Sequence, residues 1–345
     1  MSSGKLKDGR AAGDSLRRLT FVSAALLFLL AAQAAASPSF GQAPACKLIV
    51  TAAGARLRER PETAAAEAGR LQLGAVVDEL ERSAEKSRVG ASEGFWHLVV
   101  APGGARGWVF GGLVAPYDPA RRDAVYLKLA GDRLANTSAT FADLSELVRF
   151  LDRATREVKA RGALAELELA RLVALARALA AMPFEQLNNQ PYKSWTDERE
   201  KEVVYSEPAG QWYVNSGVLW DLQRKYRDLP LAERIAWEAS QTPLPGECEG
   251  YLPCYIYKET ETNGRYLKLY PRGAHADAAL SKLAESLGHI VESFRDGNSP
   301  YEVPREDRAS FRRSVAALRA QLAPLPAAKK ARVTGQLDAI AKRFP

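Results

Sequence analysis

The spacing of apolar and polar residues changes near residue 118. Before this point, apolar residues come in short alternating bursts separated by glycine, as in the runs GAVVDELERS, FWHLVVAPGG and ARGWVFGGLV. Alternation with a period of two predicts strands that bury one face, and glycine between such runs predicts turns. The segment from residue 46 to residue 118 is therefore predicted to be a small β domain.

After residue 119 the spacing becomes helical. The segment FADLSELVRFLDRATREVKARG and the run ALAELELARLVALARALAAM both carry apolar residues three and four positions apart. They predict two long helices that pair in an antiparallel hairpin. The C-terminal tail predicts two more amphipathic helices, broken at Pro324 and Pro326. The expected fold class is thus multidomain β + α, with an all-α helical domain over residues 119–345.

The first 45 residues follow a third pattern. Five basic residues and two acidic ones precede an uncharged, mostly apolar run that is shorter than the ~20 residues needed to cross a bilayer, and small residues follow it. This order is typical of a secretory signal peptide, which we place at residues 1–36 with cleavage near Ala36 and a linker over residues 37–45. The alternative is an uncleaved N-terminal membrane anchor. In either case the remaining chain is expected to be exported to the periplasm or cell envelope, with no integral membrane span in the mature chain.

The charge of the chain does not indicate a nucleic-acid partner. Of its net charge of +7, residues 1–45 contribute +3, residues 46–118 contribute none, and the remainder contributes +4. A protein that neutralises a phosphate backbone needs a dense cluster of lysine and arginine. The sequence has no such block outside the predicted signal peptide, so nucleic acid is not expected as a ligand.

Two of the three cysteines, Cys248 and Cys254, lie close together in the stretch GECEGYLPC. Disulfides persist in an exported protein, and Gly250 and Pro253 allow the turns that bring the two α-carbons within range. We therefore predict a Cys248–Cys254 disulfide that shapes the loop near residues 246–254. Cys46 is left over, either as a buried free thiol or as an intermolecular link.

No metal or cofactor is predicted. A zinc site needs four ligands, and the chain has three scattered histidines and no second pair of ligands at short spacing. The sequence also has no glycine-rich phosphate loop and no nucleophile elbow.

Two catalytic alternatives remain open at this point. Cys248 could be a nucleophile with His275 as its base, and Glu247 and Glu249 could form an acid pair like those of sugar-cleaving enzymes. Neighbours on a tight loop, however, more often face solvent. Whether the protein is an enzyme is left uncertain, with a non-catalytic function preferred.

The segment from about Ala55 to Val114 resembles the bacterial SH3 (SH3b) module. The resemblance depends on an ordered series: Leu57-Arg58 before Pro61, Gly74 ahead of two valines, Trp96 within an alternating strand, and Gly107-Trp108-Val109. It implies a small β-barrel that binds peptidoglycan or another envelope protein. Arg58, Trp96 and Trp108 could line its groove, although the alternating apolar residues around Trp96 favour a place in the core.

The helical part offers fewer motifs. The segment NGRYLKLYPRGAHADAALSKLAESLGHIVESF is similar to one helical hairpin of tetratricopeptide-like envelope proteins, but it occurs once and has no repeat period. Trp195, Trp212 and Tyr213 lie in loop-like sequence beside proline and glycine, where an aromatic residue often makes a binding contact.

Together these patterns predict a non-catalytic binding or scaffold protein of the cell envelope, in which the SH3b module docks to peptidoglycan or an envelope protein and the helical domain binds a partner. The competing hypothesis is a cell-wall hydrolase with an acidic site near Glu247 and Glu249.

Overall fold

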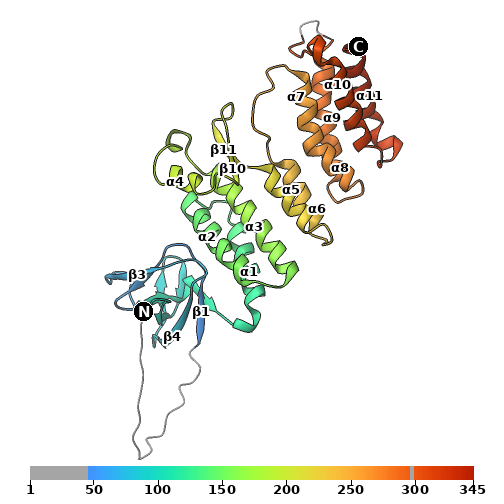
Figure 1. The fold of residues 1–345 in the computed structure, drawn as a ribbon. Helices are drawn as coiled ribbons and strands as arrows, with labels where there is room; N and C mark the ends of the chain where they lie inside the picture. The colour runs from blue at the N-terminus through green and yellow to red at the C-terminus, as the bar shows by residue number, and fades with distance from the viewer. Residues whose placement is uncertain (1–45, 296–298) are drawn as a thin grey trace, which may run out of the picture. The chain divides into compact units, whose positions relative to one another are not determined.

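The computed structural model describes residues 46–295 and 299–345, whose elements are labelled in Figure 1 and which fall within a single unit, Pro44–Pro345. The predicted signal peptide and linker lie outside the described residues. Within the described part, a β region is followed by a helical region, which confirms the coarse fold prediction.

The β region contains one seven-stranded antiparallel sheet with the strand order β3-β2-β8-β7-β4-β1-β9. The sheet is open, with β3 and β9 at its two edges. Its strands are β1 (Lys47–Val50), β2 (Ala55–Arg58), β3 (Glu67–Leu71), β4 (Val76–Arg82), β7 (Trp96–Val100), β8 (Arg106–Phe110) and β9 (Val114–Pro116).

Because apolar and polar residues alternate along the strands, the two faces of this sheet carry different side chains. One face packs into a core with the side chains of Leu48, Val50, Ala55, Leu57, Leu71, Val77, Val99 and Val109. The next residue along a strand points to the other face because side chains alternate with a period of two. The polar segment between β4 and β7 has structure of its own. It forms a small hairpin of β5 (Ser87–Val89) and β6 (Ser92–Gly94), turned by Gly90 at φ +60°.

The first helices are α1 (Arg122–Ala135), α2 (Phe141–Glu157) and α3 (Arg161–Ala180). Helix α2 begins with a capping box, in which the Thr140 hydroxyl accepts from the backbone N–H of Asp143 and the Asp143 carboxylate accepts from that of Thr140. The predicted pairing of α2 with α3 is confirmed by their extensive contact.

Next along the chain come α4 (Tyr192–Asp197), the hairpin of β10 (Val203–Ser206) and β11 (Gln211–Val214), α5 (Ser216–Lys225) and α6 (Ala232–Gln241). The hairpin was not predicted. Its two strands flank the tight turn Glu207–Gly210, which the backbone N–H of Gly210 closes by donating to the carbonyl of Glu207 at 3.1 Å.

The remaining helices are α7 (Leu252–Glu259), a π-helical turn (Thr260–Gly264), α8 (Arg265–Leu269), α9 (Ala276–Ser293), α10 (Arg308–Gln321) and α11 (Ala327–Arg343). Helices α8 and α9 form the predicted helical hairpin across the turn that contains Pro271 and Gly273, and α10 and α11 are the two predicted tail helices. Among the described residues, no helix is both long enough and apolar enough to cross a membrane.

Polar contacts join the turn between β3 and β4 to helix α2. The Glu146 carboxylate accepts from the backbone N–H groups of Gly54 at 2.9 Å and Leu73 at 2.6 Å, and Arg153 donates to the carbonyl of Leu73 at 2.7 Å. Gly74, at φ +76°, lies directly against the ring of Phe150. These contacts hold the edge of the β region on α2.

Candidate functional site

Arg58 and Trp108, predicted from the SH3b resemblance, are cross-strand partners on β2 and β8. Both are half-buried, and both point away from the sheet core because their neighbours Leu57 and Val109 point into it. The Arg58 guanidinium also donates to the carbonyl of Ala65 at 2.9 Å. The structure thus brings these two predicted residues together on one accessible face.

Trp96 is a packed residue rather than an accessible one. Its side chain is 3% exposed and meets Phe110 edge-on, with ring centroids 5.6 Å apart. Little of the indole surface is left for a ligand to touch.

Trp195 is also packed, and it lies on the short helix α4 rather than in a loop. Its side chain is 3% exposed and meets the ring of Phe141, at the start of α2, at 5.2 Å. The guanidinium of Arg199 lies over the indole at 4.3 Å and donates to the Trp195 carbonyl at 2.9 Å. Trp195 therefore supports an arginine inside the fold.

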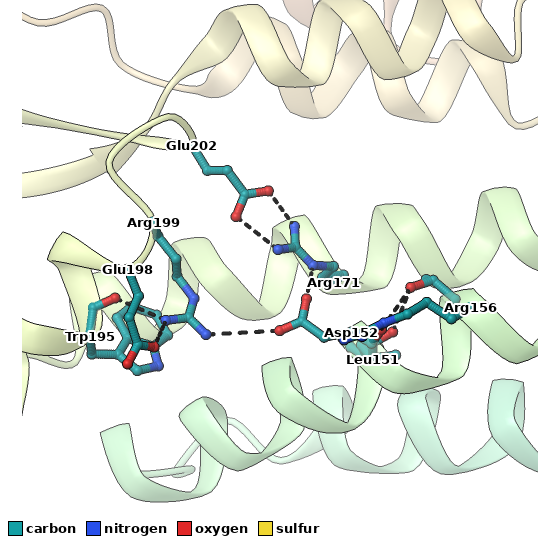
Figure 2. A network of polar contacts seen from close by, with 9 residues as sticks. Leu151, Asp152, Arg156, Arg171, Trp195, Glu198, Arg199 and Glu202 are labelled. Carbon is teal, nitrogen blue, oxygen red and sulfur yellow. Dashed lines mark hydrogen bonds and ion pairs between the residues drawn. The ribbon is translucent and has the colours of Figure 1, made fainter. Parts of the chain in front are cut away.

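Arg199 belongs to a network of charged residues that joins α2, α3 and the segment between α4 and β10 (Figure 2). Arg171 on α3 donates to both oxygens of Glu202, at 2.6 and 2.8 Å, and also to Asp152 on α2. Burial alone would lower the pKa of Arg171, but the hydrogen bonds to Glu202 and Asp152 outweigh it and raise that pKa above the ordinary value. Since every charge here has a partner of opposite sign, the network braces the helices.

Trp212 and Tyr213 are neighbours on β11, so they point to opposite faces of the hairpin. Trp212 faces Tyr205 on β10, with ring centroids 5.3 Å apart, and its inner edge packs against the helical core. Tyr213 lies on the other face beside Gln211. Only Trp212 therefore shares a surface with the exposed Tyr205.

A depression of about 740 Å³ lies between this hairpin and the disulfide loop. The hairpin contributes Tyr205, Glu207 and Pro208 to its lining, and the loop contributes Gly246, Glu247 and Glu249. Tyr205 is 38% exposed, and all three carboxylates are exposed. Within the part of the chain that the structure describes, none of the three carboxylates takes part in an ion pair. We call this surface the hairpin depression.

An exposed phenylalanine adds to the apolar character near the hairpin turn. Phe184 is 65% exposed, and its ring lies on Gly210, where a β-carbon would come within 2.5 Å of it. The signal for the hairpin was present in the sequence, because VVYS and QWYV are rich in β-branched and aromatic residues and flank the turn EPAG.

The loop on the other side of the depression is fixed at several points. Cys248 and Cys254 form the predicted disulfide, with their α-carbons 5.4 Å apart. Gly250 adopts φ +82° and lies against the carbonyl of Pro300, an approach that a side chain would block. The backbone N–H of Leu252 donates to the backbone carbonyl of Glu302 at 3.0 Å. The carboxylates of Glu247 and Glu249 thus project from a constrained loop.

The remaining candidates do not form a catalytic arrangement. Cys248 is oxidised and offers no thiolate, while His275 stacks on Trp237 at 4.5 Å between ring centroids. Cys46 is an exposed free cysteine, which corrects the idea of a buried thiol. In residues 46–295 and 299–345 no group of three or more histidine, cysteine, aspartate or glutamate side chains could hold a metal ion.

Comparison with known proteins yields no relative. No family model matches the chain, and no curated protein and no solved structure is similar to it.

Proposed function

We propose that this chain is an exported, non-catalytic binding protein of the cell envelope whose ligand is peptidoglycan or an envelope protein. Export is supported by the basic and then apolar start of the sequence. It is also supported by the bonded cysteine pair, because disulfides persist in oxidising compartments.

The β region is proposed to be a variant of the SH3b module. Its short antiparallel strands and the pairing of Arg58 with Trp108 on an accessible face suit a small docking domain. An indole beside a guanidinium offers an apolar surface and a hydrogen-bond donor at one place, a combination that is enriched at binding hot spots.

The observation that carries the proposal is the hairpin depression. It combines an exposed tyrosine ring with three exposed carboxylates that have no ion-pair partner among the described residues. Aromatic rings pack against apolar faces, and carboxylates accept hydrogen bonds from hydroxyl and ammonium groups. Peptidoglycan presents all of these groups, in its sugar rings and in its peptides.

Co-sedimentation of the purified protein with peptidoglycan sacculi tests this function. We expect salt-resistant pelleting that Tyr205→Ala weakens and that Tyr257→Ala leaves unchanged. Tyr257 is a matched control because it is an exposed tyrosine that does not line the depression. Equal pelleting of both variants would exclude the hairpin depression as the site, and no pelleting of the unmodified protein would exclude peptidoglycan and leave an envelope protein as the ligand.

A second candidate function, hydrolysis of the cell wall, is favoured by one observation only: Glu207, Glu247 and Glu249 line the same depression. A glycosidase keeps its general acid protonated by removing it from water, and these three side chains are exposed. Release of soluble fragments from the sacculi, abolished by Glu247→Gln or Glu249→Gln, would establish the hydrolase.

A further inference from the structure

A different surface, at the start of helix α2, has the features of a small-ligand site. A depression of about 460 Å³ lies where α2 and α4 meet the β region. Its apolar lining includes Phe141, Pro191 and Trp195, and its charged lining includes Arg149. This depression shares no lining residue with the hairpin depression, so a ligand bound here would be independent of the proposed function.

The acidic groups of this depression already have partners within the protein. Glu146 accepts from two backbone N–H groups. Asp143 closes the capping box of α2 and lies 3.6 Å from Arg133, and Glu198 pairs with Arg199 at 3.1 Å. Arg70, the second arginine of the lining, donates to Glu67 at 2.7 Å.

Arg149 is the exception. It is exposed, and within the part of the chain that the structure describes it has neither a hydrogen bond nor an ion pair. A guanidinium carries five N–H donors in a planar fork, which matches the two oxygens of a carboxylate. The indole N–H of Trp195, which also lines this depression, is a buried donor without an acceptor among the described residues. The polar groups of this depression that lack a hydrogen-bond partner among the described residues are therefore donors.

We infer that this depression binds a ligand that carries a single carboxylate next to an apolar group, with Arg149 holding the carboxylate and the half-buried ring of Phe141 and the exposed Pro191 receiving the apolar part. A small aromatic acid and the free C-terminus of a short peptide share this chemistry. A multiply charged anion is not favoured, because the Glu146 carboxylate lies in the same lining.

The test uses the whole protein and two pairs of probes. Calorimetry measures the binding of each probe, and the ¹⁵N–¹H signals of the tryptophan indoles report where it binds. One pair is 3-phenylpropionate and its neutral amide; the other is the tripeptide Ala-Ala-Phe with a free and with an amidated C-terminus. We expect at least one acid to bind and to shift the Trp195 indole signal, and the amides to bind at least about tenfold more weakly. Binding of the tripeptide acid alone would identify a peptide C-terminus as the ligand, whereas binding of 3-phenylpropionate alone would identify a small acid.

Arg149→Gln should weaken acid binding about tenfold or more, and Arg149→Lys should weaken it less. Arg156→Gln is the matched control, because Arg156 is an exposed arginine on the same helix that does not line the depression. Arg149 is exposed as well, so neither variant should unfold the protein, and far-ultraviolet circular dichroism checks this. Equal binding of acid and amide, full binding by Arg149→Gln, or no binding of either acid would overturn the inference.

Discussion

Gly74 provides a direct test of how the turn between β3 and β4 is packed on helix α2. This residue adopts φ +76°, and a β-carbon built on it would lie 2.1 Å from Cδ2 of Phe150. Replacement by alanine therefore adds two costs: the left-handed backbone conformation and a steric overlap with a buried aromatic ring. Phe150 is 2% exposed, so its ring has little room to move.

The two costs can be separated with Gly90, in the turn between β5 and β6. Gly90 also has a positive φ, +60°, but a β-carbon there would meet nothing within 4 Å. Gly90→Ala should thus cost only the backbone term, about 1–2 kcal/mol. Gly74→Ala adds overpacking of about 1–3 kcal/mol, for a total of about 2–5 kcal/mol.

Urea unfolding of the two variants and the unmodified protein measures this difference as a shift in the midpoint at constant slope. Phe150→Leu, alone and combined with Gly74→Ala, completes a double-mutant cycle. Because the smaller side chain relieves the overlap, we expect a coupling energy of at least about 1 kcal/mol in favour of the double variant. If Gly74→Ala costs no more than Gly90→Ala and the cycle shows no coupling, the turn does not pack on α2 as described.

Three further predictions concern buried charge and the disulfide. Burial raises the pKa of the Glu259 carboxyl above its ordinary value of 4.5. The protonated carboxyl therefore stabilises the folded protein fully below pH 4.5, and this stabilisation is lost as the pH rises through the higher folded-state pKa. The urea midpoint of Glu259→Gln should consequently rise relative to that of the unmodified protein between pH 4 and pH 7. Arg171→Gln should lower the free energy of unfolding by about 2–4 kcal/mol because it leaves partly buried carboxylates unpaired. Lys128→Gln, which breaks an exposed ion pair, should lower it by less than about 1 kcal/mol in the same assay. Replacing Cys248 and Cys254 by alanine opens a small loop and should cost about 2 kcal/mol by thermal or urea unfolding, and a reductant should destabilise only the unmodified protein.

The elements that the sequence predicted well are those with a strong local signal. Helix α2 combines an apolar stripe with the capping box of Thr140 and Asp143, and the tail helices are separated by Pro324 and Pro326. The disulfide was predictable because only five residues separate its cysteines and glycine and proline lie between them. In each case the deciding interactions lie within a few positions along the chain.

The features that were missed depend on contacts between distant segments. Pro191 suggested a loop around Trp195, but proline is tolerated at the beginning of a helix, and the ring is buried by Phe141, far away in the sequence. Likewise, Glu207 lines the same depression as Glu247 and Glu249 only because the hairpin and the disulfide loop come together in space. No local pattern contains this information.

The distribution of carboxylates in the structure favours binding over hydrolysis. A general acid must be both withdrawn from water, so that it keeps its proton, and open to the substrate. Glu259 meets the first condition, since burial raises its pKa, but it lines neither the hairpin depression nor the depression at α2. Glu207, Glu247 and Glu249 meet the second condition, since all three are exposed. Because the two properties reside on different residues, no carboxylate that lines either depression combines them by burial, and the exposed carboxylates of the hairpin depression are open to accept hydrogen bonds from a ligand.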